Sequence, residues 1–185
     1  MLRKPIKFNR RLAPRPLRRF CPDYRVRSVS EIDPQELAQD GFKAALLDMD
    51  NTLLPWRGET VPEETRVWIE SCTRAGLKLC LVSNARNRVR LKAMSEKLGV
   101  PFASGRLKPA REGFEHALRL VGASPSETVM IGDQIFTDVW GGNRMGIVTI
   151  LVEPVHPREF IGTKFSRVAE RVVMWFLRRA VEPSP

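Results

Sequence analysis

The stretch Phe42-Lys-Ala-Ala-Leu-Leu-Asp-Met-Asp-Asn-Thr52 joins an apolar run to two carboxylates that follow it directly. Residues 42–47 are apolar except for Lys43, which is typical of a strand buried on both faces of a parallel sheet. The carboxyl ends of such strands form the edge at which open α/β sheets bind ligands. We therefore expect Asp48 and Asp50 to lie at a binding edge.

The sequence that follows alternates short apolar runs with helical periodicity, the pattern of repeated βαβ units. It predicts an α/β fold: an open, doubly wound (Rossmann-like) parallel sheet of about five strands with helices on both faces. A capping box of Thr60 and Glu63 marks the expected start of the first helix. The expected strands cover 42–47, 77–82, 100–103, 128–131 and 147–152, and the expected helices cover 60–76, 86–98, 109–122 and 135–144.

Charge divides the chain of 185 residues into three segments. Its net charge of +10 comes from 31 Lys+Arg and 21 Asp+Glu, and its 43% hydrophobic content is enough for a core. Residues 1–28 carry ten basic and one acidic residue, residues 29–155 carry fifteen and seventeen, and residues 156–185 carry six and three. We therefore predict a basic N-terminal segment (1–28) that is loosely attached, a nearly neutral core (29–155) and a basic C-terminal helix (156–185).

The basic ends leave several partners open. Such segments bind nucleic acid or an anionic membrane surface, or act as solvated tails. In the C-terminal segment, apolar residues at helical spacing alternate with arginines, so this helix is expected either to lie on an anionic bilayer or to pack on the domain or another subunit. The apolar residues are Phe165, Val168, Val172, Trp175 and Phe176, and the arginines are Arg167, Arg171, Arg178 and Arg179.

The sequence favours a cytoplasmic protein, with peripheral contact at the inner face of a membrane as an open alternative. No run approaches the roughly 18 apolar residues of a spanning helix. Three scattered cysteines fit a reducing compartment, and residues 1–28 contain no apolar secretory core. An organelle transit segment is disfavoured because this arginine-rich stretch has four prolines and no serine before Ser28.

Polar side chains follow the other predicted strands as well. Ser83 and Asn84 follow the second strand, Lys108 precedes a helix, and Asp133 and Asp138 follow the fourth strand. Carboxylates gathered at one edge repel one another unless a cation lies among them, and their oxygen ligands suit Mg²⁺. A lysine, a hydroxyl and loop N–H groups suit a phosphate, and aspartate is a known covalent nucleophile in phosphoryl transfer.

Four of these segments resemble, in order and spacing, the motifs of the haloacid dehalogenase (HAD) phosphatases. They are Asp48-Met-Asp-Asn-Thr52, Ser83-Asn-Ala85, Lys108-Pro109 and Gly132-Asp-Gln-Ile-Phe-Thr-Asp138. The resemblance covers about residues 40–153 and extends to the YqeG-type branch of subfamily IIIA, which is related to phosphatidylglycerophosphate phosphatases. Ala85 departs from that branch, where many members carry a further polar residue.

The resemblance implies a role for each motif residue. Asp48 would be the nucleophile, and Asp50 the general acid and base, with its backbone carbonyl on Mg²⁺. Ser83, Asn84 and Lys108 would bind the phosphoryl group. The metal residues implied are Asp48, Asp50, Asp133 and Asp138, the last as a carboxylate that orients the metal from further out.

The spacing of the motifs leaves no room for the cap domain that many HAD enzymes insert. Segments 53–81 and 87–107 hold only a helix and a strand each. An uncapped edge suits a phosphate carried by something large, such as a lipid at a membrane, a protein or a nucleic acid end. We expect a Mg²⁺-dependent phosphomonoester hydrolase that forms an aspartyl-phosphate, with phosphatidylglycerophosphate as a candidate substrate. The alternatives are a phosphatase of nucleic-acid terminal phosphates and a catalytically weak HAD-fold protein that binds a GTPase or the ribosome; an oligomer is compatible with each.

Overall fold

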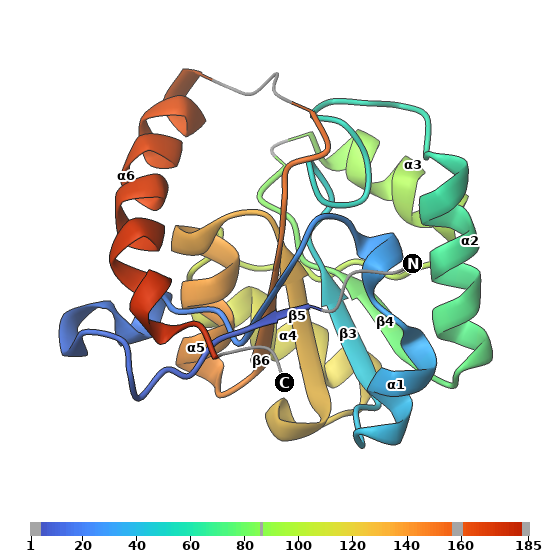
Figure 1. The fold of residues 1–185 in the computed structure, drawn as a ribbon. Helices are drawn as coiled ribbons and strands as arrows, with labels where there is room; N and C mark the ends of the chain where they lie inside the picture. Colours follow the sequence, from blue (N-terminus) through green and yellow to red (C-terminus); the bar gives the residue numbers. More distant parts are fainter. Residues whose placement is uncertain (1–4, 86, 157–160, 183–185) are drawn as a thin grey trace.

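The computed structural model describes residues 5–85, 87–156 and 161–182. Its six-stranded sheet has the order β1-β2-β6-β5-β3-β4, in which β1 is antiparallel and the other neighbouring pairs are parallel (Figure 1). The strands are β1 (Ile6–Lys7), β2 (Tyr24–Val26), β3 (Ala44–Leu47), β4 (Lys78–Leu81), β5 (Thr128–Gly132) and β6 (Val148–Val152).

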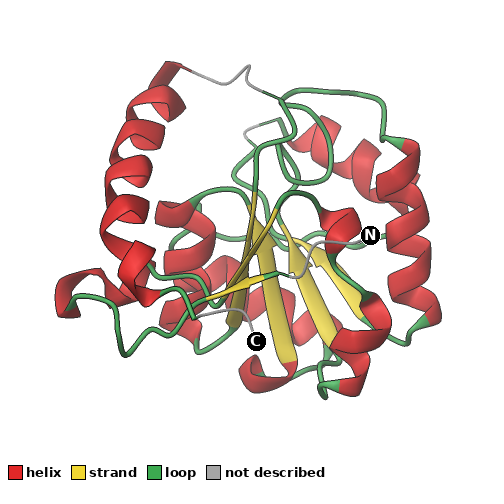
Figure 2. Cartoon of the chain, viewed as in Figure 1, coloured by secondary structure: helices red, strands yellow, loops and turns green. Residues whose placement is uncertain are grey.

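Helices cover both faces of this sheet, as the sequence predicts (Figure 2). The α-helices are α1 (Pro34–Gln39), α2 (Glu63–Arg74), α3 (Arg88–Leu98), α4 (Arg111–Val121), α5 (Trp140–Met145) and α6 (Ile161–Leu177). Short helical turns are η1 (Arg15–Phe20), η2 (Val29–Glu31), η3 (Pro125–Glu127), the π-helical turn η4 (Ile135–Val139) and η5 (Arg178–Ala180). None of the helices in the described part of the chain has the length and apolar character of a membrane-spanning segment.

The two cores follow from the alternation of side chains along the strands. In β3, Ala45 and Leu47 pack with residues of α2 and α3 on one face, whereas Ala44 and Leu46 pack with α4 on the other. Phe114 of α4 is the largest side chain of the second core. Because β3 is buried on both faces, its sequence is continuously apolar rather than alternating.

The N-terminal segment is more firmly attached than the sequence predicts. Strand β2 pairs with β6 over Tyr24–Val26 and extends the parallel sheet. Phe8, Ala13 and Cys21 form a further apolar cluster with Leu177 and Ala180 at the C-terminal end of α6 and in η5. The expectation of a loosely attached segment is therefore wrong for the described residues 5–28.

Two other local predictions also need correction. The segment 100–103 is not a strand of the sheet but a single bridge between Phe102 and Leu81. Helix α2 begins at Glu63 behind Pro62, which makes no side-chain cap, so the capping box of Thr60 is not formed. Proline at that position fixes an extended entry into the helix without a polar cap.

The chain order creates a switch point in the middle of the sheet. From β3 the chain proceeds to β4 on one side and then returns to β5 on the other side of β3. Ligands of doubly wound folds bind outside the carboxyl ends of strands at such a point. Asp48 follows β3 and Asp133 follows β5, so both lie at this crevice. Between β3 and β5 the described residues form α2, β4, α3, α4 and η3 and no second sheet.

Candidate active site

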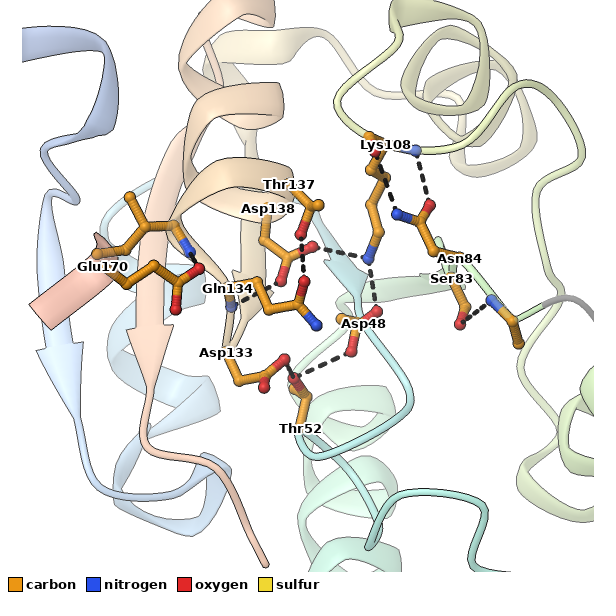
Figure 3. Close-up of polar contacts among 12 residues, drawn as sticks. Asp48, Thr52, Ser83, Asn84, Lys108, Asp133, Gln134, Thr137, Asp138 and Glu170 are labelled. Atoms are coloured by element: carbon orange, nitrogen blue, oxygen red, sulfur yellow. Dashed lines mark hydrogen bonds and ion pairs between the residues drawn. The ribbon is translucent and has the colours of Figure 1, made fainter. Parts of the chain in front are cut away.

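Three carboxylates meet at the switch point. Asp48, Asp133 and Asp138 each place one oxygen within 4.8 Å of the others, and all three residues are buried (Figure 3). Asp48 and Asp133 come from the ends of neighbouring strands, and Asp138 comes from η4. The structure therefore brings together three of the four aspartates predicted to hold a metal.

Lys108 lies inside this group, and its ammonium joins two of the carboxylates. Its Nζ is 2.5 Å from Asp48 Oδ1 and 2.7 Å from Asp138 Oδ1 (Figure 3). The side chain of Asn84 fixes the lysine from behind: its Oδ1 accepts from the Lys108 backbone N–H at 2.7 Å, and its Nδ2 donates to the Lys108 carbonyl at 3.1 Å. The Asn84 amide thus positions Lys108. The motif resemblance assigns Asn84 to the phosphoryl group and does not predict this role.

Burial and neighbouring charge oppose each other in this cluster. Burial raises the pKa of Asp48 to about 6, although the Lys108 ammonium partly counteracts it. The pKa of Asp133 is raised well above its ordinary value, first by burial and then by the charge of Asp48. Burial alone would lower the pKa of Lys108, but the carboxylates of Asp138 and Asp48 raise it above its ordinary value. Lys108 therefore stays protonated, and the cluster has a demand for additional positive charge.

Thr52 contributes a hydroxyl that the sequence reading did not single out. Its Oγ1 lies 3.3 Å from both Asp48 Oδ2 and Asp133 Oδ1, between the ends of β3 and β5 (Figure 3). One hydroxyl proton can be donated to only one of the two carboxylates at a time. Thr52 follows Asp48 by four residues within the first motif. This position in the motif is the feature of the sequence that could have identified Thr52 as a site residue.

Asp138 fits beside the sheet only because residue 132 is glycine. A Cβ on Gly132 would lie 2.4 Å from Asp138 Cγ, closer than nonbonded carbon atoms approach. The backbone N–H of Gln134 also donates to Asp138 Oδ2 at 3.0 Å. The glycine and this hydrogen bond together fix the carboxylate that faces Lys108.

We predict that Gly132→Ala displaces Asp138 and lowers the free energy of unfolding by about 1–3 kcal/mol, the usual cost of overpacking. Thermal unfolding measures this change. The matched control is Gly113→Ala in α4, where the new Cβ would be 3.5 Å from the nearest atom, the Arg106 carbonyl oxygen, at ordinary contact distance. Equal unfolding temperatures for Gly132→Ala and the wild type would contradict the packing argument.

Asp50 lies outside the carboxylate cluster in this structure. Its Oδ1 and Oδ2 accept from the Arg90 guanidinium at 2.8 and 3.0 Å, and its Oδ1 also accepts from the Arg57 backbone N–H at 2.9 Å. Arg90 is on α3 and donates in addition to the Gly58 carbonyl. Two parallel hydrogen bonds of this kind hold a carboxylate in a defined orientation.

Ser83 lies at the end of β4, next to the loop that carries Asn84. Its Oγ accepts from the backbone N–H of Ala85 at 3.2 Å, which shapes the turn behind the strand (Figure 3). The structure records no contact of Ser83 with the three carboxylates among the described residues. Its assignment to a phosphoryl group stays a prediction.

Helix α6 contacts the carboxylate cluster through Arg167. Arg167 forms an ion pair with Asp133 and a second with Glu170 at 2.9 Å. Glu170 is buried, and its Oε1 accepts from the backbone N–H of Ile135 at 2.9 Å, at the start of η4. The C-terminal helix is therefore joined to the loop that carries Asp133 and Asp138, a link the sequence reading did not find.

The core holds a buried lysine between two buried aspartates at its switch point, where doubly wound folds bind ligands. A fixed cation beside carboxylates suits an enzyme that transfers phosphoryl groups. A family model described as HAD-hydrolase-like matches residues 106–154. Over 160 residues the chain is 38% identical to the probable phosphatase YqeG of Bacillus subtilis (strain 168), a match that covers 86% of this chain and 92% of that protein. The chain belongs to the HAD-like hydrolases, in the family of the YqeG-type phosphatases.

Two further similarities concern a named phosphatase and a solved structure. The chain is 29% identical over 178 residues to phosphatidylglycerophosphate phosphatase 1, chloroplastic/mitochondrial, of Arabidopsis thaliana; the match covers 88% of this chain and 49% of that protein. The crystal structure of an uncharacterized protein from Listeria monocytogenes serotype 4b has a TM-score of 0.51 at 15% identity and covers 73% of this chain and 98% of that chain. This likeness confirms the fold alone, and it agrees with the predicted α/β core.

Proposed function

We propose that this phosphatase hydrolyses a phosphomonoester through an aspartyl-phosphate on Asp48, with Mg²⁺ as its metal. The observation that carries the proposal is the contact of a buried aspartate at the switch point with a buried lysine, beside two further carboxylates. Asp48 would attack phosphorus as the bond to the leaving oxygen breaks. Water would then attack the phosphoaspartate, releasing inorganic phosphate and restoring Asp48.

The carboxylate group fits a hard divalent cation. Asp48, Asp133 and Asp138 offer one oxygen each within 4.8 Å, and such oxygen ligands match the preference of Mg²⁺. Asp48 and Asp133 would hold the ion, and Asp138 would orient the site from beside Lys108. When bound, Mg²⁺ would neutralise the charge on the phosphoryl oxygens.

Lys108 would bind the phosphoryl oxygens. Its ammonium is already 2.5 Å from the nucleophile, so a phosphoryl group on Asp48 would lie within its reach. Asn84 keeps the lysine backbone in place, and Ser83 would offer a further hydroxyl. A fixed cation that is shielded from water stabilises the developing negative charge more than a mobile one.

Asp50 would protonate the leaving oxygen and later accept the proton of the attacking water. This role requires a carboxyl group held near the reacting atoms, and Asp50 follows the nucleophile Asp48 by two residues in the chain. The two hydrogen bonds from Arg90 supply that fixed position in the present structure. Arg90 is then a positioning residue that acts through Asp50.

We predict that Arg90→Met lowers kcat about tenfold for alkyl phosphates and much less for p-nitrophenyl phosphate, because only a poor leaving group depends on the positioned acid. The comparison of kcat between the two substrates measures the effect. Arg88→Met is the matched control, since Arg88 is an exposed residue on the same helix. An equal loss with both substrates would assign Arg90 a structural role only.

For the substrate, we favour the phosphomonoester of an anionic glycerophospholipid, with phosphatidylglycerophosphate as the leading candidate and the membrane surface as its site of presentation. The similarity to the Arabidopsis phosphatase supports this choice. The described residues form no second sheet or cap domain beside the carboxylate cluster, which supports a large substrate. Among the alternatives, a terminal phosphate on nucleic acid is supported by the arginines gathered near η1 and α5, which are Arg10, Arg11, Arg18, Arg19 and Arg144.

The test is a substrate panel with purified full-length protein in Mg²⁺ and in EDTA. The panel contains phosphatidylglycerophosphate in detergent, oligonucleotides with a terminal phosphate, and p-nitrophenyl phosphate. We expect Mg²⁺-dependent release of inorganic phosphate, fastest from the lipid. Faster release from oligonucleotides would favour the nucleic-acid alternative, and no release from any substrate would favour a binding protein.

A further inference from the structure

The outer face of α6 is apolar and uncovered within the described part of the chain. We define the α6 docking face as Val168, Val172, Trp175 and Phe176 with the three exposed arginines Arg171, Arg178 and Arg179. The exposed fractions of the four apolar residues lie between 46% and 59%. The rings of Trp175 and Phe176 meet edge to face, with 4.8 Å between their centroids.

The opposite face of the same helix already packs on the domain. Leu177 is buried in the cluster with Phe8 and Cys21, and Val173 and Met174 pack against Ile135 and its neighbours. The helix therefore has enough inward contact to be held in place, and Figure 1 shows it at the edge of the molecule. The apolar residues of the docking face are additional to that core.

The charge of this face has a single sign. Between positions 167 and 181 the sequence contains one acidic residue, Glu170, which is buried and bound to Arg167 and to the Ile135 N–H. Exposed Trp and Phe beside arginines are typical of a helix that lies in the headgroup region of an anionic bilayer. A symmetric dimer through this face would instead place the arginines of two copies close together, and the defined face itself contains no acidic residue to pair with them.

We propose that the α6 docking face binds an anionic lipid bilayer. Trp175 and Phe176 would enter the boundary between headgroups and acyl chains, and Arg171, Arg178 and Arg179 would contact lipid phosphates. Each arginine near such a surface adds to the electrostatic attraction, which salt weakens.

Docking of this kind would bring the catalytic edge to the lipid surface. Arg167 lies on the same helix and pairs with Asp133, so the docking face and the carboxylate cluster belong to one connected unit. A groove of about 1470 Å³ lies beside the helix and has Asp133, Arg171 and Trp175 among its lining residues. This inference rests on the proposed function in one respect, namely that a membrane-borne phosphomonoester gives the docking a purpose.

The experiment is co-sedimentation of the full-length protein with phosphatidylcholine vesicles that contain or lack phosphatidylglycerol. We expect binding only with the anionic lipid and weaker binding at high salt. The double variant Trp175→Ser/Phe176→Ser should bind at least tenfold more weakly. Val89→Ser is the control, because Val89 is the most exposed apolar residue among the large hydrophobics of the described chain and lies on α3.

A second variant, Arg171→Gln/Arg178→Gln, keeps the apolar residues and should lose the preference for anionic lipid. Vesicle binding that is unchanged in both double variants would overturn the proposal. The proposal would also be overturned if the wild type formed a dimer in the absence of lipid and Trp175→Ser/Phe176→Ser were monomeric, since the face would then be a subunit interface. Hydrolysis of p-nitrophenyl phosphate distinguishes the docking proposal from the proposed function. Variants that no longer bind vesicles should hydrolyse this substrate at the wild-type rate. If the proposed function is wrong, the wild type should bind vesicles but not hydrolyse the substrate.

Discussion

Asp48→Asn is expected to reduce kcat for every phosphomonoester by about 10⁵-fold, as removal of a covalent nucleophile does in other enzymes. The asparagine amide has nearly the size of the carboxylate but cannot take up the phosphoryl group. The variant should still fold, because Lys108 keeps Asp138 as a partner at 2.7 Å. Steady-state phosphate release measures the loss, and mass spectrometry of acid-quenched enzyme should find phosphate on the wild type and none on the variant.

The control for this variant is Asp40→Asn, which changes an exposed aspartate at the end of α1. It should leave both turnover and the phosphoenzyme unchanged. Turnover by Asp48→Asn within tenfold of the wild type, at the same thermal stability, would rule out the aspartyl-phosphate mechanism. A phosphorylated peptide that does not contain residue 48 would do the same.

The central strands could be predicted from the sequence because each is buried on both faces. A continuous apolar run such as Ala44–Leu47, followed directly by a polar residue, is typical of a strand buried on both faces of a parallel sheet. Strand β2 could not be predicted in this way. Its three residues, Tyr24–Val26, lie in a strongly basic segment, and what makes them a strand is pairing with β6, more than a hundred residues away. Local pattern does not encode such a partner.

The residues of the site also divide into those that a local sequence pattern indicates and those that only the packing of distant segments brings in. Asp48, Lys108 and Asp133 occupy short motifs directly behind strands or before a helix, so the sequence shows both their chemistry and their place. Arg90 and Arg167 reach the site from helices that are distant in sequence. With 31 Lys+Arg in the chain, composition cannot indicate which arginine meets a carboxylate. Partners of this kind become visible only once the helices are packed.

The second large effect is expected from replacement of Lys108, because loss of its ammonium should lower both kcat and the free energy of unfolding. Lys108→Met keeps the length and apolar stem of the side chain but deletes the ammonium between Asp48 and Asp138. Loss of one partner from a buried ion pair costs about 3–5 kcal/mol of folding free energy. Loss of a fixed charge on the phosphoryl group costs about 10²–10³ in kcat.

The pKa values give this variant a dependence on pH that a simple packing defect would lack. Burial already raises the pKa of Asp48 to about 6, and without Lys108 it should rise further, since the ammonium is what lowers it. A carboxyl group with a raised pKa in the folded state favours folding below that pKa, and this contribution is lost as the pH rises through it. The variant should therefore be closest to the wild type in unfolding temperature near pH 5 and furthest from it near pH 8.

Mg²⁺ should recover part of the stability of Lys108→Met at pH 8, because a divalent cation among the carboxylates replaces the missing positive charge. Thermal unfolding of the wild type and the variant, each with Mg²⁺ and with EDTA at both pH values, measures the effect. Lys92→Met is the control, since Lys92 is exposed on α3 and its nearest acidic partner, Glu96, is 3.9 Å away. If the unfolding temperature of Lys108→Met falls equally at both pH values and Mg²⁺ does not change it, then Lys108 acts through packing, and the charge balance derived for the cluster is wrong.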